Sequence, residues 1–202
     1  MAALAAADAA ALTRAFRAFF AEAADPVIDD VLSAWPAEPE TWSLPAASPL
    51  PVLDHLPTAF DALPDPCAAL ARALAAAALG LNWQQTYTAE DMGEAFLRRY
   101  GWTLVAGPGG LIEQTGLIAG FLLLGPDVDY PPHRHSAEEI YRVVAGRASW
   151  KVGDADRRPL PPGAVVHNPP WQPHGMRTEL ERILAAENLS RDVYEIASKA
   201  LA

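Results

Sequence analysis

The sequence changes character near residue 100, and this change constrains the fold more than any other feature. Before that point, alanine and leucine recur at the spacing of an amphipathic helix. After Gly101, short apolar runs alternate with glycine and proline turns, which is typical of short strands. We therefore expect a helical region over residues 1–100 and a mainly β region over residues 101–202.

Four helices are expected in the first region, because each segment has helical spacing and a boundary signal such as a proline or a glycine. They cover residues 2–23, 26–34, 66–79 and 89–100. Thr88 is expected to cap the last of them, with Asp91 three residues further on. Five prolines between residues 36 and 51 predict a loop that runs over the surface.

The second region predicts many short strands. Apolar runs lie at residues 102–106, 111–114, 117–124, 164–167 and 182–188. Residues 140–145 and 148–152 flank Gly146 and predict a hairpin, and residues 192–201 predict a closing helix. The residues alone therefore indicate a helical region followed by a small β-barrel or sandwich.

Charge and cysteine content exclude several classes of function. The net charge is −10 and no basic run exists, so neither nucleic acid nor an anionic membrane surface is an expected partner. The chain has no long uncharged apolar stretch, and its alanine-rich amino terminus lacks the basic start of a signal peptide. Cys67 is the only cysteine, which rules out an intramolecular disulfide and a thiolate metal cluster. We expect a cytoplasmic protein with a small-molecule substrate.

Residues 133–141 carry the densest group of chemically active side chains. Four of them have the same parity and would share one face of an extended segment, unless a turn at residues 136–137 breaks the register: His133, His135, Glu139 and Tyr141. Further along the chain, His174 supplies another imidazole. Imidazole and carboxylate ligands suit divalent zinc, iron, manganese, nickel or cobalt, and the sequence does not choose among them. The first interpretation is a mononuclear metal enzyme whose site is closed by the fold.

These residues resemble the cupin superfamily. The pattern His133-x-His135-x3-Glu139-x6-Gly146 is similar to the first cupin motif, and Gly163-x5-Pro169-x4-His174 is similar to the second. The second motif departs from the usual pattern, because Trp171 stands in place of its glycine. The resemblance covers about residues 120–180. It implies a cupin double-stranded β-helix barrel behind the N-terminal α-helical region, with one divalent metal ion (Fe2+, Zn2+, Mn2+ or Ni2+) held by His133, His135, Glu139 and His174.

A narrower resemblance is to the cupin-type dimethylsulfoniopropionate (DMSP) lyases. It rests on Tyr130, on residues 133–141, on Trp150 and on residues 169–175 around His174, together with a helical region before the barrel. Residues 83–87 also look like a helical segment of that family. The family cleaves DMSP into dimethyl sulfide and acrylate by β-elimination. The resemblance implies that Tyr141 acts as the base and that Tyr130 lies close by.

The implied chemistry sets requirements on the pocket. A metal ion would draw charge from the substrate carboxylate and make the Cα proton more acidic. A tyrosine has a pKa of about 10, so a nearby cation must help Tyr141 to ionise. The sulfonium group of the substrate favours aromatic faces. The aromatic residues expected to contact it are Trp83, Tyr87, Trp150 and Trp171.

Two other functions stay open. One is a cupin metalloenzyme of another reaction type, such as an isomerase or dioxygenase, acting on a different small carboxylate. The other is a non-catalytic cupin that binds a small ligand. Loss of activity without oxygen would indicate a dioxygenase, since an elimination needs none. His167 is interpreted as a strand or turn histidine and not as a ligand. An edge strand could pair two copies of the chain into a homodimer.

Overall fold

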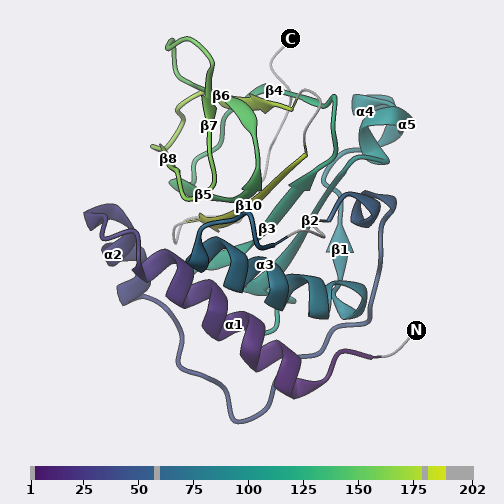
Figure 1. The fold of residues 1–202 in the computed structure, drawn as a ribbon, viewed down its shortest axis with the longest axis vertical. Helices are drawn as coiled ribbons and strands as arrows, with labels where there is room; N and C mark the ends of the chain where they lie inside the picture. Colours follow the sequence, from purple (N-terminus) through teal and green to yellow (C-terminus); the bar gives the residue numbers. More distant parts are fainter. Residues whose placement is uncertain (1–2, 57–59, 179–181, 190–202) are drawn as a thin grey trace.

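The computed structural model describes residues 3–56, 60–178 and 182–189. The helices over residues 6–33 and 65–77 lie together on one side of a β-barrel, and those over residues 89–97 lie apart from them, at upper right (Figure 1). The helical elements are α1 (Ala6–Ala21), α2 (Pro26–Ser33), η1 (Pro51–His55), α3 (Asp65–Ala77), η2 (Ala78–Gly80), α4 (Ala89–Met92) and α5 (Glu94–Leu97). Among the described residues, no helix combines the length and the apolar character that a membrane crossing needs.

The first three expected helices are confirmed, each with slightly shorter bounds. The side chain of Asp25 accepts a hydrogen bond from the backbone N–H of Val27 and so caps α2. Thr88 and Asp91 form the expected capping box at the start of α4. The single helix over residues 89–100 is wrong, because Gly93 adopts a φ of 80° that separates α4 from α5.

In the described part of the chain, ten strands form two antiparallel sheets. Six of them make a sheet in the order β1-β2-β3-β10-β5-β8, and four make a second sheet in the order β4-β9-β6-β7. Their bounds are β1 (Trp83–Gln84), β2 (Tyr100–Ala106), β3 (Ile118–Leu124), β4 (Asp129–His133), β5 (Glu139–Gly146), β6 (Ala148–Val152), β7 (Arg158–Leu160), β8 (Val165–Asn168), β9 (His174–Arg177) and β10 (Ile183–Leu189). From β3 to β6 the chain alternates between the two sheets, as in a double-stranded β-helix. The expected cupin barrel with an N-terminal helical region is confirmed.

Two strand predictions are wrong. β5 and β6 do not form a hairpin, because β5 pairs with β8 and β10 while β6 pairs with β7 and β9. The chain passes from one sheet to the other at Gly146, whose φ of 81° and close approach to the carbonyl of Arg182 leave no room for a side chain. Residues 111–114 form no strand and contribute only an isolated bridge between Ala106 and Ile112.

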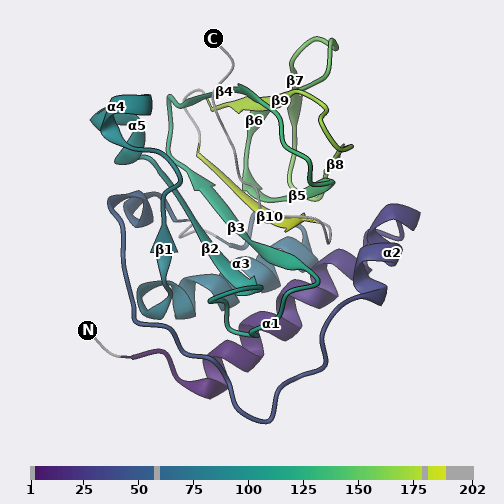
Figure 2. The same ribbon diagram turned by 180° about the vertical axis from the view of Figure 1, so that it is seen from behind.

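Each strand of the six-stranded sheet has one face toward the helices and one toward the barrel interior. On β5, Ile140 and Val144 pack in the core shared with the helices, whereas Tyr141 and Val143 pack inside the barrel. α1 and α3 lie side by side across the outer face of this sheet (Figure 2). One apolar core thus runs from the helical half into the barrel half of the chain. The boundary expected near residue 100 stays a prediction, and residues 192–201 lie outside the described residues.

Candidate metal centre in the barrel

Three histidines meet at one end of the barrel interior. His133 ends β4 and His174 begins β9, and the register of these strands places the two residues opposite each other. His135 follows β4 in the turn over residues 134–138. The nitrogen atoms of the three imidazoles that could bind an ion all lie within 4.8 Å of one another. The turn at residues 136–137 that could break the register is present, so residues 133–141 do not form a single extended face and His135 is separated from β5.

The three imidazoles are oriented by their own backbone. Their Nδ1 atoms lie close to carbonyl oxygens of nearby residues: His133 to Pro131 at 3.1 Å, His135 to Ala137 at 3.0 Å and His174 to Gln172 at 2.8 Å. A carbonyl can only accept, so each Nδ1 carries the proton and donates it. In a neutral ring with this tautomer, Nε2 carries the lone pair, and this is the form that a metal-binding histidine needs.

Glu139, the first residue of β5, brings a carboxylate to the same place. Its Oε2 lies 3.0 Å from Nε2 of His174, and its Oε1 lies 3.6 Å from Nε2 of His135. The side-chain amide of Asn168 on β8 donates a hydrogen bond to Oε2 at 2.8 Å. Asn168 was missed from the sequence. Its signal is a polar residue at an inward position of a strand, two residues after the buried Val166.

Burial and proximity set the charge states of these groups. Burial lowers the pKa of His133 to about 4, and the neighbouring His174 contributes to the shift, so His133 is neutral near neutral pH. Burial alone would raise the pKa of Glu139, but the imidazoles of His135 and His174 hold it well below its usual range. Burial likewise opposes protonation of His174, while its contact with Glu139 raises its pKa.

A divalent cation fits this group of residues. Nε2 of His174 is buried and makes no hydrogen bond of ordinary geometry among the described residues, although it lies near the Glu139 carboxylate. A buried nitrogen lone pair without a donor is costly unless a cation satisfies it. Three imidazole nitrogens and one carboxylate form a ligand set that divalent transition metals accept. His133, His135 and His174 could therefore hold a metal ion, and the carboxylate of Glu139 lies beside two of them.

Aromatic side chains cluster inside the barrel, and one of them contacts a histidine of the centre. The ring of Tyr130 stacks on His133 with centroids 4.6 Å apart, and its hydroxyl lies 3.2 Å from the hydroxyl of Tyr87. Tyr141 points inward from β5, and its ring centroid lies 5.1 Å from that of Trp150. Burial, with the neighbouring tyrosines, raises the pKa of the Tyr130 phenol well above its usual value. The structure thus places Tyr87, Tyr130, Tyr141 and Trp150 in one cluster.

Trp83 and Trp171 lie elsewhere. Trp83 is buried in the core next to the helices, where its indole N–H donates to the carbonyl of Ala78 at 2.9 Å. The expected helix over residues 83–87 is wrong, because Trp83 and Gln84 form β1. Trp171 is 62% exposed, and its backbone N–H donates to the carbonyl of His135 at 2.7 Å. Its φ of 62° is unusual for a residue other than glycine.

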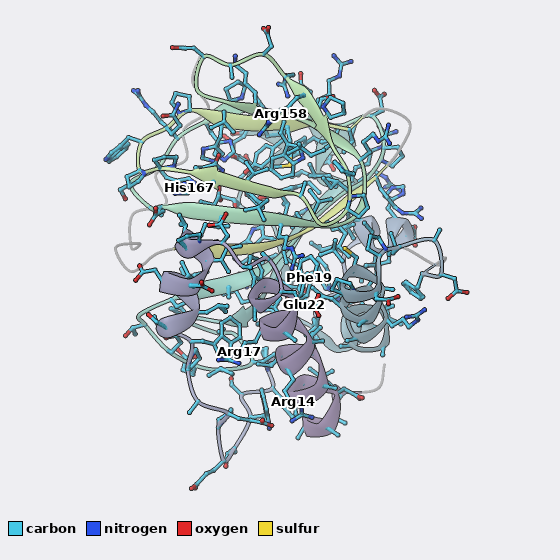
Figure 3. All side chains as sticks on the ribbon, turned by 60° about the vertical axis from the view of Figure 1, so that its left-hand side comes forward. Arg14, Arg17, Phe19, Glu22, Arg158 and His167 are labelled. Carbon is cyan, nitrogen blue, oxygen red and sulfur yellow. The ribbon has the colours of Figure 1, made fainter. Side chains whose placement is uncertain are left out.

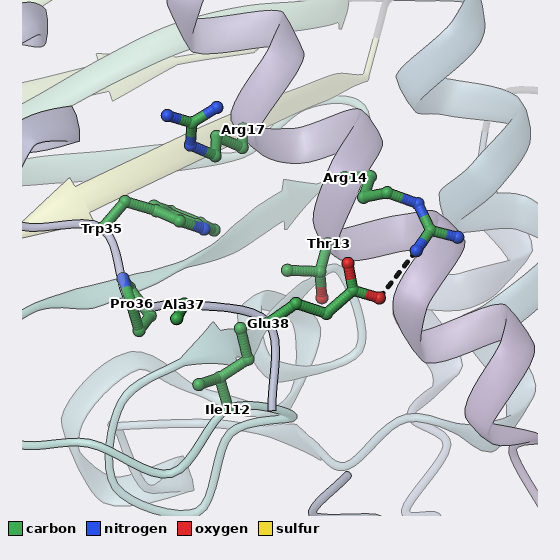
Figure 4. A pocket seen from close by; sticks show the side chains of 8 residues that line it. All are labelled: Thr13, Arg14, Arg17, Trp35, Pro36, Ala37, Glu38 and Ile112. Atoms are coloured by element: carbon green, nitrogen blue, oxygen red, sulfur yellow. Dashed lines mark hydrogen bonds and ion pairs between the residues drawn. The ribbon is translucent and has the colours of Figure 1, made fainter. Parts of the chain in front are cut away.

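A separate cavity of about 420 Å³ lies against α1 in the helical layer (Figure 4). Thr13, Arg17 and Trp35 line it, and the ion pair of Arg14 with Glu38 at 2.7 Å lies along one side. It contains none of the residues that gather around the histidines. His167 lies on β8 and is labelled in Figure 3. As expected, it does not belong to the group formed by the other three histidines of the barrel.

The chain is similar in sequence and in structure to dimethylsulfoniopropionate lyases. The chain is 34% identical over 111 residues to DddQ, a dimethylsulfoniopropionate lyase of Ruegeria pomeroyi, and the match covers 55% of each protein. The chain thus spans about half the length of the curated relatives that it matches. The crystal structure of DddQ from the same organism superposes with a TM-score of 0.71 at 28% identity, over 90% of this chain and 94% of that one.

A second solved structure, of the DMSP lyases RdDddP and RnDddQII, superposes with a TM-score of 0.81 at 32% identity, over 97% of this chain and 98% of that one. A profile for a domain of unknown function with ARM repeats matches residues 169–202, but the described part of that stretch contains β9 and β10 of the barrel. The profile of the dimethylsulfoniopropionate lyase family matches residues 28–185, from α2 to β10. The chain therefore belongs to the dimethylsulfoniopropionate lyase family.

Proposed function

We propose that this chain cleaves DMSP into dimethyl sulfide and acrylate, and that it does so with one divalent transition-metal ion. His133, His135, Glu139 and His174 would hold the ion. The observation that carries the proposal is the meeting of these four groups inside the barrel of a chain from the lyase family. Iron, zinc, manganese and nickel all suit three imidazoles and a carboxylate, so the proposal does not choose among them.

The bound ion would supply positive charge that acidifies the Cα proton of the substrate. Tyr141 is the proposed base. Its phenolate takes the Cα proton, the electrons of that C–H bond form the Cα–Cβ double bond of acrylate, and the Cβ–S bond breaks with its electron pair leaving on dimethyl sulfide. The place of Tyr141 supports this role, because it points into the barrel two residues after Glu139 on the same strand.

The other aromatic residues would form the pocket. Tyr130, stacked on His133, is the proposed second catalytic phenol. Trp150 and Tyr87 share the interior cluster and would present faces to the sulfonium group. Trp171 would contact the substrate from outside the cluster, next to His135. Trp83 is left out of the proposed pocket because its indole packs against the helical layer.

The test is headspace gas chromatography for dimethyl sulfide after DMSP is added to protein loaded with each metal in turn. The His135→Ala and Tyr141→Phe variants should give no product while staying folded. Tyr100→Phe is the matched control for Tyr141→Phe, because Tyr100 lies in the same cluster but its hydroxyl bonds Thr86 at 3.1 Å. A silent wild-type protein with all of iron, manganese, zinc and nickel would end the proposal. A cytoplasmic location and a homodimer stay predictions.

A further inference from the structure

We propose that the last two residues of β8, His167 and Asn168, are positioning residues for two of the groups around the candidate metal centre. Asn168 would orient the carboxylate of Glu139 directly. His167 would act through Glu138 on the turn that carries His135. The inference rests on the metal centre of the proposed function, but it concerns how that centre is held and not which substrate it serves.

Asn168 lies beside Glu139 because the two residues are register partners in the pairing of β8 with β5. Its side chain points inward and is 1% exposed. The Asn168 amide donates to Oε2 of Glu139 at 2.8 Å, and the same oxygen lies 3.0 Å from Nε2 of His174. One bond therefore sets the rotation of the carboxylate, and with it the direction in which both oxygens face the imidazoles.

Stability alone does not account for an asparagine at this position. The Oδ1 atom of Asn168 is buried and has no hydrogen-bond partner within the described part of the chain. A buried amide oxygen without a partner is unfavourable, and an apolar side chain of similar shape would avoid that cost. The amide donates a hydrogen bond to Glu139, and the benefit of this bond is the orientation of the carboxylate.

His167 precedes Asn168 and points the other way, toward the rim of the barrel. Its Nε2 lies 2.7 Å from Oε1 of Glu138, and both side chains are about one-third exposed. Glu138 ends the turn over residues 134–138, in which His135 sits. Near the other end of the turn, the backbone N–H of Trp171 donates to the carbonyl of His135 at 2.7 Å. The turn is thus held by one contact near each of its two ends.

This arrangement makes β8 a common support for two groups that approach the centre from different elements. Glu139 belongs to a strand and would move little without Asn168, apart from rotation of its carboxylate. His135 belongs to a turn, where loss of the Glu138 contact would let the backbone shift. Groups that orient metal ligands typically contribute ~10–100-fold to metal affinity. We therefore expect a loss in that range for each residue.

The experiment measures the affinity of the metal-free protein for Zn2+ alone by competition with a chromogenic chelator, and the thermal midpoint of the same metal-free samples. Asn168→Leu and His167→Leu should each weaken Zn2+ binding by ~10–100-fold. Asn168→Leu should leave the thermal midpoint of the metal-free protein unchanged or higher. Asn168→Gln keeps an amide donor, His167→Gln replaces the imidazole donor with an amide donor, and both should recover part of the affinity. His55→Leu is the control for a histidine outside the site.

Unchanged affinity in both leucine variants would overturn the proposal. So would a lower thermal midpoint of the metal-free protein together with no recovery in the glutamine variants, because that pattern indicates a structural role only. A wild-type protein that binds Zn2+ but forms no dimethyl sulfide with any of the four metals would remove the proposed lyase function and leave this inference standing. A wild-type protein that binds no Zn2+ would overturn this inference and leave the lyase function to be tested with the other metals.

Discussion

The guanidinium of Arg142 lies over the ring of Phe19, with its carbon 4.2 Å from the ring centroid. Arg142 comes from β5 and Phe19 from α1, so this contact joins the barrel wall to the helical layer. Figure 3 shows Phe19 of α1, and Glu22 just after this helix, next to the sheet. The Arg142 Nε atom also donates to the carbonyl of Gly163 at 3.3 Å, whereas one terminal nitrogen has no partner among the described residues.

We expect the Arg142–Phe19 contact to contribute to stability. A cation over an aromatic face is worth about 2 kcal/mol when it is shielded from water. In a double-mutant cycle with Arg142→Met and Phe19→Leu, the coupling free energy should be about 1–2 kcal/mol. Denaturant unfolding of the four proteins gives this value. A coupling free energy near zero would mean that the contact between the two side chains does not stabilise the fold.

Metal binding should raise the stability of the folded chain. A ligand that binds only the native state adds about 2.7 kcal/mol at a concentration of about 100 times its Kd. For a chain of this length the Tm should then rise by roughly 5–10 °C. Calorimetry with and without Zn2+ measures the shift. His174→Ala should abolish it, and an equal shift in that variant would place the ion somewhere else.

The backbone of Trp171 should be strained in the folded state, and its indole should contact the substrate. A glycine adopts a φ of 62° without penalty, whereas other residues there cost about 1–2 kcal/mol. Trp171→Gly should therefore leave the free energy of unfolding unchanged or higher. If the exposed indole captures the sulfonium group, the same variant should raise KM for DMSP more than it lowers kcat. Steady-state kinetics separates the two constants, and unchanged kinetics would remove Trp171 from the pocket.

Cys67 should be inert in the folded protein. Burial raises the pKa of its thiol, against the opposing effect of Arg142, and the side chain is fully buried. A group with a raised folded pKa contributes stability below its unfolded pKa and loses it as the pH rises. At mildly alkaline pH, a chromogenic aryl disulfide should react slowly with the native chain and at once in denaturant. A fast native reaction would show that this part of the helical layer opens readily.

Features that depend on neighbouring residues or on a known motif were predictable from the sequence. The cap formed by Thr88 and Asp91 is one, because its partners are three residues apart. The partnership of His133 with His174 came from the spacing of two motifs, and the register of β4 with β9 brings these residues together. The barrel itself followed from the same motifs.

Features that depend on long-range pairing were not predictable. An apolar run, a glycine and another apolar run look alike whether the two strands pair with each other or enter different sheets, as they do around Gly146. Trp83 had helical spacing to Tyr87, but pairing of β1 with β2 overrides that spacing. The only local signal of Asn168 is its polar side chain at an inward strand position, and its role stays hidden because its partner Glu139 lies on another strand.

The order of strands in the larger sheet has a consequence for biosynthesis. β10 is the last described strand of the chain, yet it lies in the middle of the six-stranded sheet, between β3 and β5. Until residues 183–189 have left the ribosome, β3 and β5 have no common neighbour and each presents an unpaired edge. The barrel can therefore close only after residues 183–189 have been synthesised, and closure is slow because it joins strands that are distant in the sequence.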